Sequence, residues 1–443
     1  MNESISNSPE RIAVAMVSPA WPGTASANGI ATYTQNLVPS LRREGMDVYV
    51  MSRFVESGCQ DDFVQPLAPT AGKPNWLKNP IRSLTMRVAP QYDLKKRVSR
   101  SILGGLGALR GRVNLRLLEM EESLGIAPFV TPHAQMPVVV RMHGPWFIVG
   151  PLVGAVEDKH FAARNRAERL ALQKAAAVSA PSLDVMRRAR EFFGLELKDA
   201  AVIPNPCPIY DQQAHWKLDR STPGEILFVG RFDNCKGADV LIDAFVKIAC
   251  QLPDARLVFV GPDNGLTDDA GRKWQIEPYA AEKLKDLRGR MQYLGKRSAQ
   301  EIEELRRRAR VTVICSRYEN FPMVALEAMS MGCPLVASAV GGLAEMIQDG
   351  KNGLLARPGD ADDLAKKIMT LLAEPQLADS LARQASIDCV QRYHPSAVAR
   401  QMAEFYREVI ARWDRQHAGS RNERISRSAP LQPLTRAVAA NKP

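Results

Sequence analysis

The chain has 443 residues, of which 45% are hydrophobic and 24% charged; this composition excludes a disordered or fibrous protein and leaves enough length for two domains. Its 59 lysines and arginines exceed its 48 aspartates and glutamates, giving a formal net charge of +11. That charge suits anionic partners such as nucleotides, lipid surfaces or nucleic acid, and it does not choose among them.

The seven cysteines form no CxxC pair and no cluster with histidine at metal-binding spacing. We therefore expect free thiols in a reducing compartment, with neither disulfides nor zinc. The first residues, MNESISNSPE, resemble no secretion signal, and no apolar run approaches the length of a membrane span. The expected location is the cytoplasm, with contact to the inner face of the membrane as an additional hypothesis.

The first half of the chain begins with a strand pattern, IAVAMVS, at residues 12–18. A turn-rich loop containing Gly29 follows, and then a helical pattern in which Pro39 should kink the helix or end its first section. Further short apolar runs predict strands at residues 47–52, 138–142 and 175–180.

The second half repeats this order, with ILFVG as a strand, RFDNCKG as a loop and ADVLIDAF as the start of a helix. Strands are predicted again at residues 255–261, 311–315, 334–338 and 352–356. Short apolar strands that alternate with helices indicate parallel sheets covered on both faces, so we expect an α/β chain of two doubly wound, Rossmann-like domains. The polar segment 210–225 should separate them, and ligands should bind between the carboxyl ends of their strands.

The loop after Gly230 carries Arg231 and Lys236, and Gly237 opens the following helix. Free backbone N–H groups and two cations suit an anion such as a diphosphate, although a basic pair in a loop is often only solvated. Gly29, in the corresponding loop of the first half, is a weaker candidate, since a lone glycine after a strand is common in turns. The chain contains neither GxGxxG nor GxxxxGK[ST], which argues against a nicotinamide dehydrogenase or a P-loop ATPase.

Two glutamates flank the segment that follows the predicted strand VTVIC. Glu319 lies in the loop SRYENFP, and Glu327 lies inside an apolar helix that should begin at Pro322. A carboxylate among apolar neighbours needs a partner. Vicinal ribose hydroxyls would satisfy Glu327, and so would the backbone of the next loop.

Residues 316–365 closely resemble the C-terminal domain of glycosyltransferase family 4, the retaining GT-B enzymes, including their E-x7-E signature at Glu319 and Glu327. The segments GRFDNCKGADVLIDAF, VIPNP and NGIATYTQNL extend the resemblance to most of the chain outside a variable insertion at 53–130 and the two ends. It implies a GT-B fold with an acceptor-side domain at 11–210, a nucleotide-sugar domain at 224–393, a helix at 394–415 that returns to the first domain, and a flexible basic tail at 416–443.

The same resemblance implies roles for individual residues. Arg231 and Lys236 would hold the donor diphosphate in place of a metal, Gly230 and Gly29 would lie in the donor-binding loops, and Glu327 would bind the ribose. Glu319 would bind the donor sugar, assisted by the backbone N–H groups of Asn320 and Phe321, and His143 would face the sugar from the first domain. We therefore predict retaining transfer of a hexosyl unit from a UDP- or GDP-sugar to a glycan or lipid-linked hydroxyl acceptor, in bacterial polysaccharide, lipopolysaccharide or glycolipid synthesis. No metal or other cofactor is expected.

Other interpretations stay open at this point. The chain could be a non-catalytic nucleotide-sugar sensor or membrane adaptor, while nucleic-acid binding lacks a recognised sequence motif.

The DAD triplet at 360–362 is better explained by helix capping than by metal binding. Residues 119–123 are expected either on the acceptor side or on a solvated helix face. Residues 73–116 mix eleven cations with apolar side chains, which predicts an amphipathic surface for an anionic bilayer.

Overall fold

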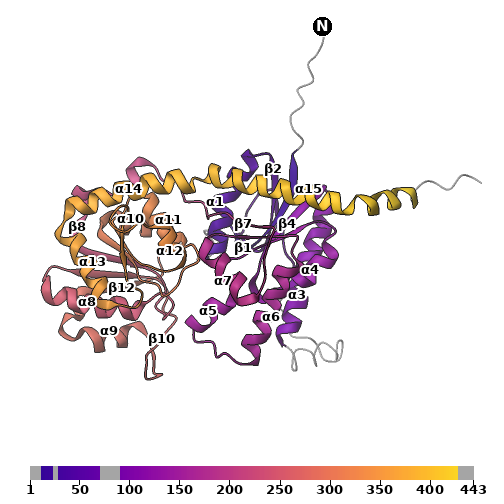
Figure 1. The fold of residues 1–443 in the computed structure, drawn as a ribbon. Coiled ribbons are helices and arrows are strands. Elements are labelled where there is room, and N and C mark those ends of the chain that lie inside the picture. The colour runs from indigo at the N-terminus through magenta and orange to yellow at the C-terminus, as the bar shows by residue number, and fades with distance from the viewer. Residues whose placement is uncertain (1–10, 23–27, 70–89, 428–443) are drawn as a thin grey trace, which may run out of the picture.

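The structure is a computed structural model that describes residues 11–22, 28–69 and 90–427. Two α/β domains lie side by side, and one long helix at the end of the chain passes from the second domain across the first (Figure 1). Both domains are built on parallel sheets, as the sequence predicted.

The N-terminal domain contains a seven-stranded sheet with the order β3-β2-β1-β4-β5-β6-β7. Its strands are β1 (Ile12–Trp21), β2 (Met46–Val55), β3 (Val64–Pro66), β4 (Leu115–Glu121), β5 (Val138–Arg141), β6 (Ala177–Ala180) and β7 (Ala200–Val202). Its helices are α1 (Gly29–Arg43), α3 (Pro90–Arg110), α4 (Ala127–Ala134), α5 (Trp146–Leu152), α6 (Lys159–Lys174) and α7 (Leu183–Phe193).

The C-terminal domain has the corresponding order β12-β9-β8-β13-β14-β15. Its strands are β8 (Thr222–Val229), β9 (Arg256–Val260), β12 (Met291–Gly295), β13 (Ala309–Ile314), β14 (Leu335–Ser338) and β15 (Leu354–Ala356), with a separate hairpin of β10 (Leu266–Thr267) and β11 (Lys273–Trp274). Its helices are α8 (Ala238–Gln251), α9 (Ile276–Leu284), α10 (Ala299–Arg308), α11 (Met323–Ser330), α12 (Gly341–Met346), α13 (Ala361–Ala373) and α14 (Pro375–Tyr393). In both sheets the order reverses beside the first strand, which is where doubly wound domains bind ligands.

Helix α1 continues through Pro39 to Arg43, so the expectation that its first section would end at this residue is wrong. Asn28 caps the helix, because its side-chain oxygen accepts from the backbone N–H of Ile30 at 2.9 Å. Leu37 and Leu41 are fully buried on either side of Pro39. Their packing compensates for the backbone hydrogen bond that a proline cannot make.

The segment 53–130, expected as an insertion, contributes integral parts of the N-terminal domain. It contains β3, α3 and β4, and β4 is a central strand paired with both β1 and β5. Its sequence LRLLEME carries three charged residues, so it does not show the continuous apolar run typical of a buried parallel strand. The alternative of a solvated helix face for residues 119–123 is wrong, because residues 119–121 lie in strand β4 and the side chains of Glu119 and Glu122 are buried.

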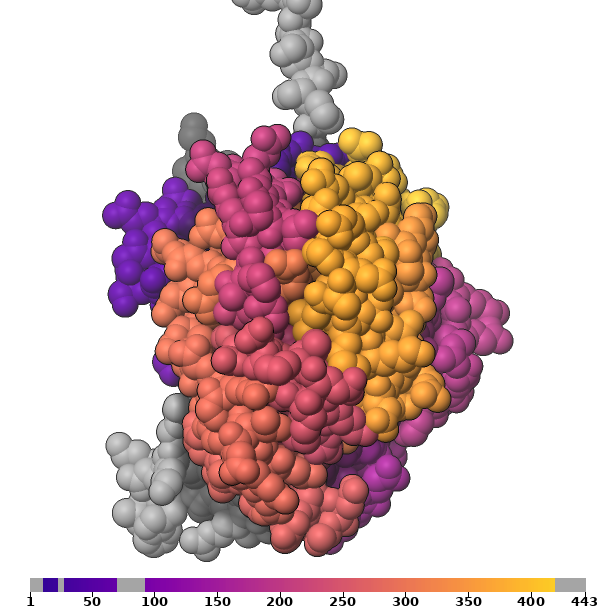
Figure 2. All heavy atoms as spheres, turned by 90° about the vertical axis from the view of Figure 1, so that its left-hand side faces the viewer, coloured from indigo at the N-terminus to yellow at the C-terminus, as the bar shows by residue number. Residues whose placement is uncertain are grey.

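Helix α15 (Pro395–Arg427) follows α14 and packs on the N-terminal domain, where Val398, Met402 and Tyr406 share a buried cluster with Tyr33 and Leu37 of α1. The space-filling view from the side of the C-terminal domain shows the last helices, orange to yellow, along one flank of the molecule (Figure 2). Because α15 extends to Arg427, the segment expected as a flexible tail begins as helix, and residues 428–443 lie outside the described residues. Among the helices that the structure describes, none is both long and apolar enough to cross a membrane.

Candidate active site

The predicted site residues lie where strands of the two domains end. Two sets come from the C-terminal domain, after β8 and after β13, and one residue follows β5 of the N-terminal domain. The domains touch at this place, since the side-chain amide of Asn320 donates a hydrogen bond to the backbone oxygen of His143. The residues concerned are Arg231 and Lys236, Glu319, Asn320 and Phe321, and His143.

The ammonium group of Lys236 lies 2.5 Å from Oε1 of Glu319, which also accepts from the hydroxyl of Ser316 at 2.6 Å. Burial disfavours the charged lysine, but the neighbouring Glu319 carboxylate outweighs it and raises the pKa of Lys236 above its ordinary value. Lys236 therefore remains a cation at neutral pH, next to Glu319, the carboxylate predicted to bind the donor sugar.

Asp233 orients both cations of the β8 loop. One of its carboxylate oxygens accepts from Nε of Arg231 at 2.6 Å, and the other accepts from the backbone N–H of Lys236 at 2.9 Å. The loop passes so close to β13 that a Cβ atom on Gly237 would lie 2.0 Å from the carbonyl oxygen of Cys315. Sequence reasoning missed Asp233, although its place between two candidate cations was a usable signal.

The loop after β13 turns its carbonyl groups toward α12. The backbone N–H of Gly342 donates to the oxygen of Glu319 at 2.8 Å, and a Cβ on Gly342 would lie 2.0 Å from the oxygen of Asn320. In a trans peptide the N–H points opposite to the C=O, so the N–H groups of Asn320 and Phe321 point away from α12. No hydrogen bond within the described part of the chain uses these two groups, which leaves a pair of donors at the site.

His143 is held by its backbone. Glu122, just after β4, accepts from the backbone N–H groups of His143 at 2.9 Å and of Gly144 at 2.6 Å. The His143 ring meets the ring of Tyr33 edge-on, with 5.1 Å between centroids. Burial and the nearby Arg141 guanidinium keep the pKa of His143 well below its ordinary value, so the imidazole is neutral at neutral pH.

Glu327 forms an ion pair with Arg306 at 2.6 Å, from inside α11. The side chain therefore does not cap the next loop, and the partner that its apolar surroundings required is an arginine only 2% exposed. Pro322 is the residue before α11 rather than the first helical one. The contact of Glu327 with a ribose stays a prediction.

The two glycines singled out by sequence have different surroundings. Gly230 follows β8 directly, and a Cβ there would lie 2.8 Å from the ring of Phe228, so close packing explains this glycine. Gly29 is the first residue of α1, and a Cβ there would meet nothing within 4 Å. The preceding residues 23–27 lie outside the described residues.

The remaining candidates concern metal and charge. Asp360 caps α13, since its side chain accepts from the backbone N–H of Asp363 at 2.9 Å, as predicted for the DAD triplet. The described residues contain no group of three potential metal-ligating side chains. In α3, Ile102 and Leu106 are buried in the core of the N-terminal domain, so these two residues do not belong to an exposed amphipathic surface. Residues 73–89 of the predicted surface lie outside the described residues.

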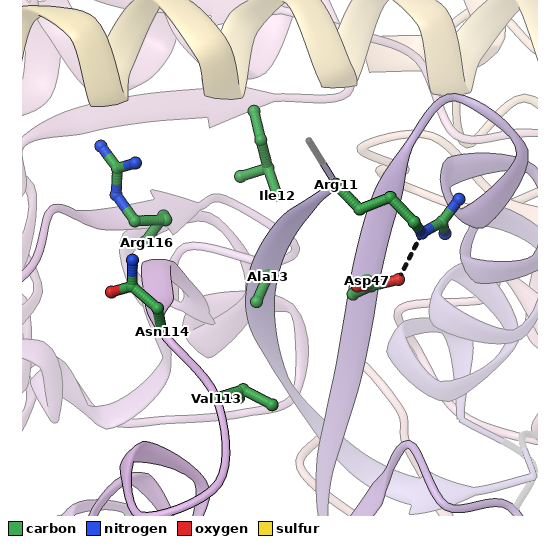
Figure 3. A pocket seen from close by; sticks show the side chains of 7 residues that line it. All are labelled: Arg11, Ile12, Ala13, Asp47, Val113, Asn114 and Arg116. Carbon is green, nitrogen blue, oxygen red and sulfur yellow. Dashed lines mark hydrogen bonds and ion pairs between the residues drawn. The ribbon is translucent and has the colours of Figure 1, made fainter. Parts of the chain in front are cut away.

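A groove of about 760 Å³ lies beside the candidate site, with walls from both domains. Tyr318 spans the domains by donating to Asp184 at 3.0 Å, and the Glu345 carboxylate accepts from the first two backbone N–H groups of α7. A smaller hollow of about 270 Å³ lies at the opposite, amino-terminal ends of β1, β2 and β4 (Figure 3). It is separate from the candidate site because it lies at the other ends of the strands, and its arginines are paired, Arg11 with Asp47 and Arg116 with Asp414.

Comparison with known proteins agrees with both halves of this arrangement. A family model described as "Glycosyl transferases group 1" matches residues 211–387, and one described as "Glycosyl transferase 4-like domain" matches residues 28–206. Glycogen synthase of Mycobacterium tuberculosis is 32% identical over 220 residues, which are 49% of this chain and 50% of that protein. The alignments thus span about half the length of the first curated relatives.

Solved structures support the fold over almost the whole chain. Sucrose-phosphate synthase from Thermosynechococcus elongatus matches with a TM-score of 0.67 and 22% identity, covering 90% of this chain and 100% of that one. Anabaena HepE, solved in complex with UDP-glucose, matches with a TM-score of 0.62 and 20% identity, covering 89% and 99%. The two-domain architecture described above is therefore the one these proteins share.

Proposed function

Since the chain belongs to the family 4 type of glycosyltransferases with the GT-B fold, we propose that it transfers a hexosyl unit from a nucleoside diphosphate sugar to a hydroxyl acceptor. The transfer proceeds with retention of anomeric configuration and without a metal ion. Its place is in bacterial polysaccharide, lipopolysaccharide or glycolipid synthesis, on the cytoplasmic side of the membrane.

One observation supports this proposal above the others. A partly buried lysine is paired with a carboxylate in the C-terminal domain, and the loop that carries this carboxylate is hydrogen-bonded through Asn320 to His143, a neutral histidine of the N-terminal domain. Withdrawing charged groups from water costs free energy. A binding protein that had lost catalysis would gain nothing from this cost, whereas an enzyme uses the charges in its reaction.

The chemistry of the proposed reaction follows from these groups. As the bond between the sugar and the diphosphate breaks, negative charge grows on the phosphate oxygens, and the fixed cations Lys236 and Arg231 stabilise it. Asp233 keeps both cations oriented. The free N–H groups of Asn320 and Phe321 donate to oxygens of the donor, and Glu319 accepts from a sugar hydroxyl. His143, neutral and fixed by Glu122, contacts the sugar from the acceptor side.

UDP- or GDP-hexose is the proposed donor, and the HepE complex with UDP-glucose supports that class. The proposed acceptor is a glycan or a lipid-linked hydroxyl. Peripheral contact with an anionic bilayer is part of the proposal, supported by cations such as Lys96 and the exposed Arg100 on α3 together with the overall charge of +11.

A donor screen tests the proposal. The protein is incubated with UDP-, GDP- and ADP-hexoses, and release of the nucleoside diphosphate is measured with and without EDTA, while a thermal-shift assay reports binding. A bound donor at about 100 times its dissociation constant adds roughly 2.7 kcal/mol of stability. Release that persists in EDTA supports the proposal. Binding without turnover, even with glycan and lipid acceptors present, would favour a non-catalytic sensor, and an absolute metal requirement would reject the metal-free mechanism.

A further inference from the structure

A second side-chain amide, from the linker after β7, contacts the loop after β13 that carries Glu319, Asn320 and Phe321. The Nδ2 group of Asn205, three residues after β7, donates to the backbone oxygen of Phe321 at 3.1 Å. Its Oδ1 accepts from Nη2 of Arg141 at 2.9 Å. Arg141 belongs to β5, only two residues before His143. The Asn205 amide thus joins the strand that presents His143 to the loop that presents Glu319.

Arg141 is a rigid anchor for this bridge. Its side chain is 0% exposed and its guanidinium lies over the ring of Tyr33, 4.4 Å from the centroid. The same Nη2 also donates to the backbone oxygen of Ile203 at 2.9 Å, and Nη1 donates to the hydroxyl of Ser179 at 3.4 Å. A buried guanidinium that is hydrogen-bonded on several sides has little freedom to move. Arg141 therefore fixes the position of the Asn205 amide, and the amide in turn restrains the loop.

Chemistry fixes the orientation of the Asn205 amide. A guanidinium only donates, and a backbone carbonyl only accepts, so the amide oxygen must face Arg141 and the amide nitrogen must face Phe321. No flipped arrangement satisfies both partners. An acid or an apolar side chain at position 205 would break at least one of the two bonds.

Asn320 makes a second hydrogen bond between this loop and the N-terminal domain, since its amide nitrogen donates to the backbone oxygen of His143. We call Asn205 and Asn320 the amide clasp. Together with the Gly342 N–H on the oxygen of Glu319, the clasp holds the loop from both sides. The direction of the Asn320 and Phe321 N–H groups relative to His143 is then set by the N-terminal domain as well as by the C-terminal one.

We propose that Asn205, held by Arg141, is a positioning residue for the transfer reaction, which orients the Asn320–Phe321 peptide toward the donor. The role rests on the proposed function and acts through the loop, because Asn205 itself need not touch the substrate. A displacement of about 1 Å in a catalytic group can cost on the order of 100-fold in rate. Loss of the clasp at Asn205 should therefore lower kcat far more than it lowers affinity for the nucleotide.

The test compares Asn205→Asp, Asn205→Ala and a matched control, Ser330→Ala. Asn205→Asp keeps an acceptor for Arg141 but sets a carboxylate against the Phe321 oxygen. Ser330 donates its hydroxyl to the backbone oxygen of Pro208 at 2.6 Å, so the control removes a bond from the same linker to the C-terminal domain without touching the loop. Measured quantities are kcat, donor KM, the dissociation constant of UDP or GDP, Tm, and amide hydrogen exchange over residues 316–326.

We expect kcat to fall at least about tenfold in both Asn205 variants, with nucleotide affinity within about threefold of wild type, and exchange of the loop amides to rise. Ser330→Ala should keep wild-type kcat and loop exchange even if its Tm falls equally. A wild-type kcat in Asn205→Asp, or an equal loss of kcat in Ser330→Ala at equal Tm, would overturn the proposal. If the wild-type protein transfers no sugar, the proposed function fails, and the exchange measurement alone decides whether Asn205 holds the loop.

Discussion

Arg306 and Glu327 form an ion pair in which Nη2 of the arginine lies 2.6 Å from a carboxylate oxygen of the glutamate. The arginine side chain is 2% exposed and the glutamate side chain 23% exposed. One partner is thus withdrawn from solvent while the other can still reach a ligand. The carboxylate of the E-x7-E signature stabilises the fold in addition to its predicted contact with the ribose.

Removal of this carboxylate should therefore have two effects. Glu327→Ala leaves a buried cation without its partner, and we expect a loss of about 3 kcal/mol in the free energy of unfolding together with a raised donor KM. The double variant Arg306→Met/Glu327→Leu should recover the stability and not the KM. Glu319→Ala should instead lower kcat more than it changes donor KM. Denaturant unfolding and steady-state kinetics check both, and the opposite kinetic split would show that the two roles are reversed.

Lys236→Ala should lower kcat by about 100-fold or more, because it removes a cation from the position proposed for the leaving diphosphate. The matched control is Lys247→Ala in the same region of the chain, where the lysine is 42% exposed and pairs with Asp362 at the surface. Its kcat should stay within about twofold of wild type, as expected for a surface ion pair. Equal activity of the two variants would remove Lys236 from the mechanism.

Gly342→Ala should disturb the loop without touching a charged group. The added methyl would lie 2.0 Å from the backbone oxygen of Asn320, so the loop must move and the two free N–H groups with it. We expect a rise of about tenfold or more in donor KM. Gly104→Ala is the control, because a Cβ at this exposed helical position meets nothing within 4 Å and should add up to about 1 kcal/mol of stability. Unchanged kinetics in Gly342→Ala would contradict the assigned role of the loop.

Stability should depend on pH through Glu122. Burial and the neighbouring Glu168 carboxylate raise the pKa of Glu122 to about 8, against an ordinary value of 4.5, although two backbone N–H bonds oppose the shift. The folded protein therefore holds this proton between pH 4.5 and 8 while the unfolded chain does not, so stability falls as pH rises through that window. Glu122→Gln cannot titrate, and its Tm should fall less between pH 5 and pH 9. Parallel Tm profiles would refute the assignment.

Membrane contact is tested by co-sedimentation with phosphatidylglycerol vesicles. The double variant Lys96→Glu/Arg100→Glu reverses two cations on α3, each worth about 1 kcal/mol at an anionic surface, so binding at low salt should fall about tenfold or more. The control, Lys174→Glu/Lys198→Glu, makes the same change in net charge at exposed positions elsewhere in the N-terminal domain. Equal loss in both variants would mean that total charge, and not this surface, directs any binding.

The strands that sequence predicted best are those buried on both faces. Strands β8, β13 and β14 each contain a short, mainly apolar run, ILFV, VTVI and LVAS, which is largely buried because helices cover the sheet on each side. Strand β4 was not predicted from the sequence because charged residues such as Glu119 interrupt its apolar pattern. The Glu119 carboxylate accepts hydrogen bonds from the hydroxyls of Tyr33 at 3.1 Å and Tyr406 at 2.7 Å. These partners are 86 and 287 positions away, so no local pattern could show that the charge is satisfied inside the core.

Some residues of the candidate site could be predicted from the sequence and others could not. Lys236 and Glu319 could be found from motifs, since each follows a recognisable strand. Two supporting residues could not be singled out in this way. Arg306 belongs to a run of three arginines that looks like a solvated helix face, and Asn205, although it lies in the segment VIPNP, has no local signal that shows its partners. The pairing of Arg306 with Glu327 appears only once the C-terminal domain is folded, and that of Asn205 with Phe321 only once the linker packs against the loop after β13.

The chain crosses between the domains twice, once in the linker after β7 and once where α14 meets α15. The two crossings are tied together, because the backbone N–H of Cys207 donates to the backbone oxygen of Tyr393 at 2.8 Å. If the site opens by rotation about these two crossings, the residues near Cys207 and Tyr393 move least, and the β10–β11 hairpin, at the far end of its domain from α14 in Figure 1, moves much farther.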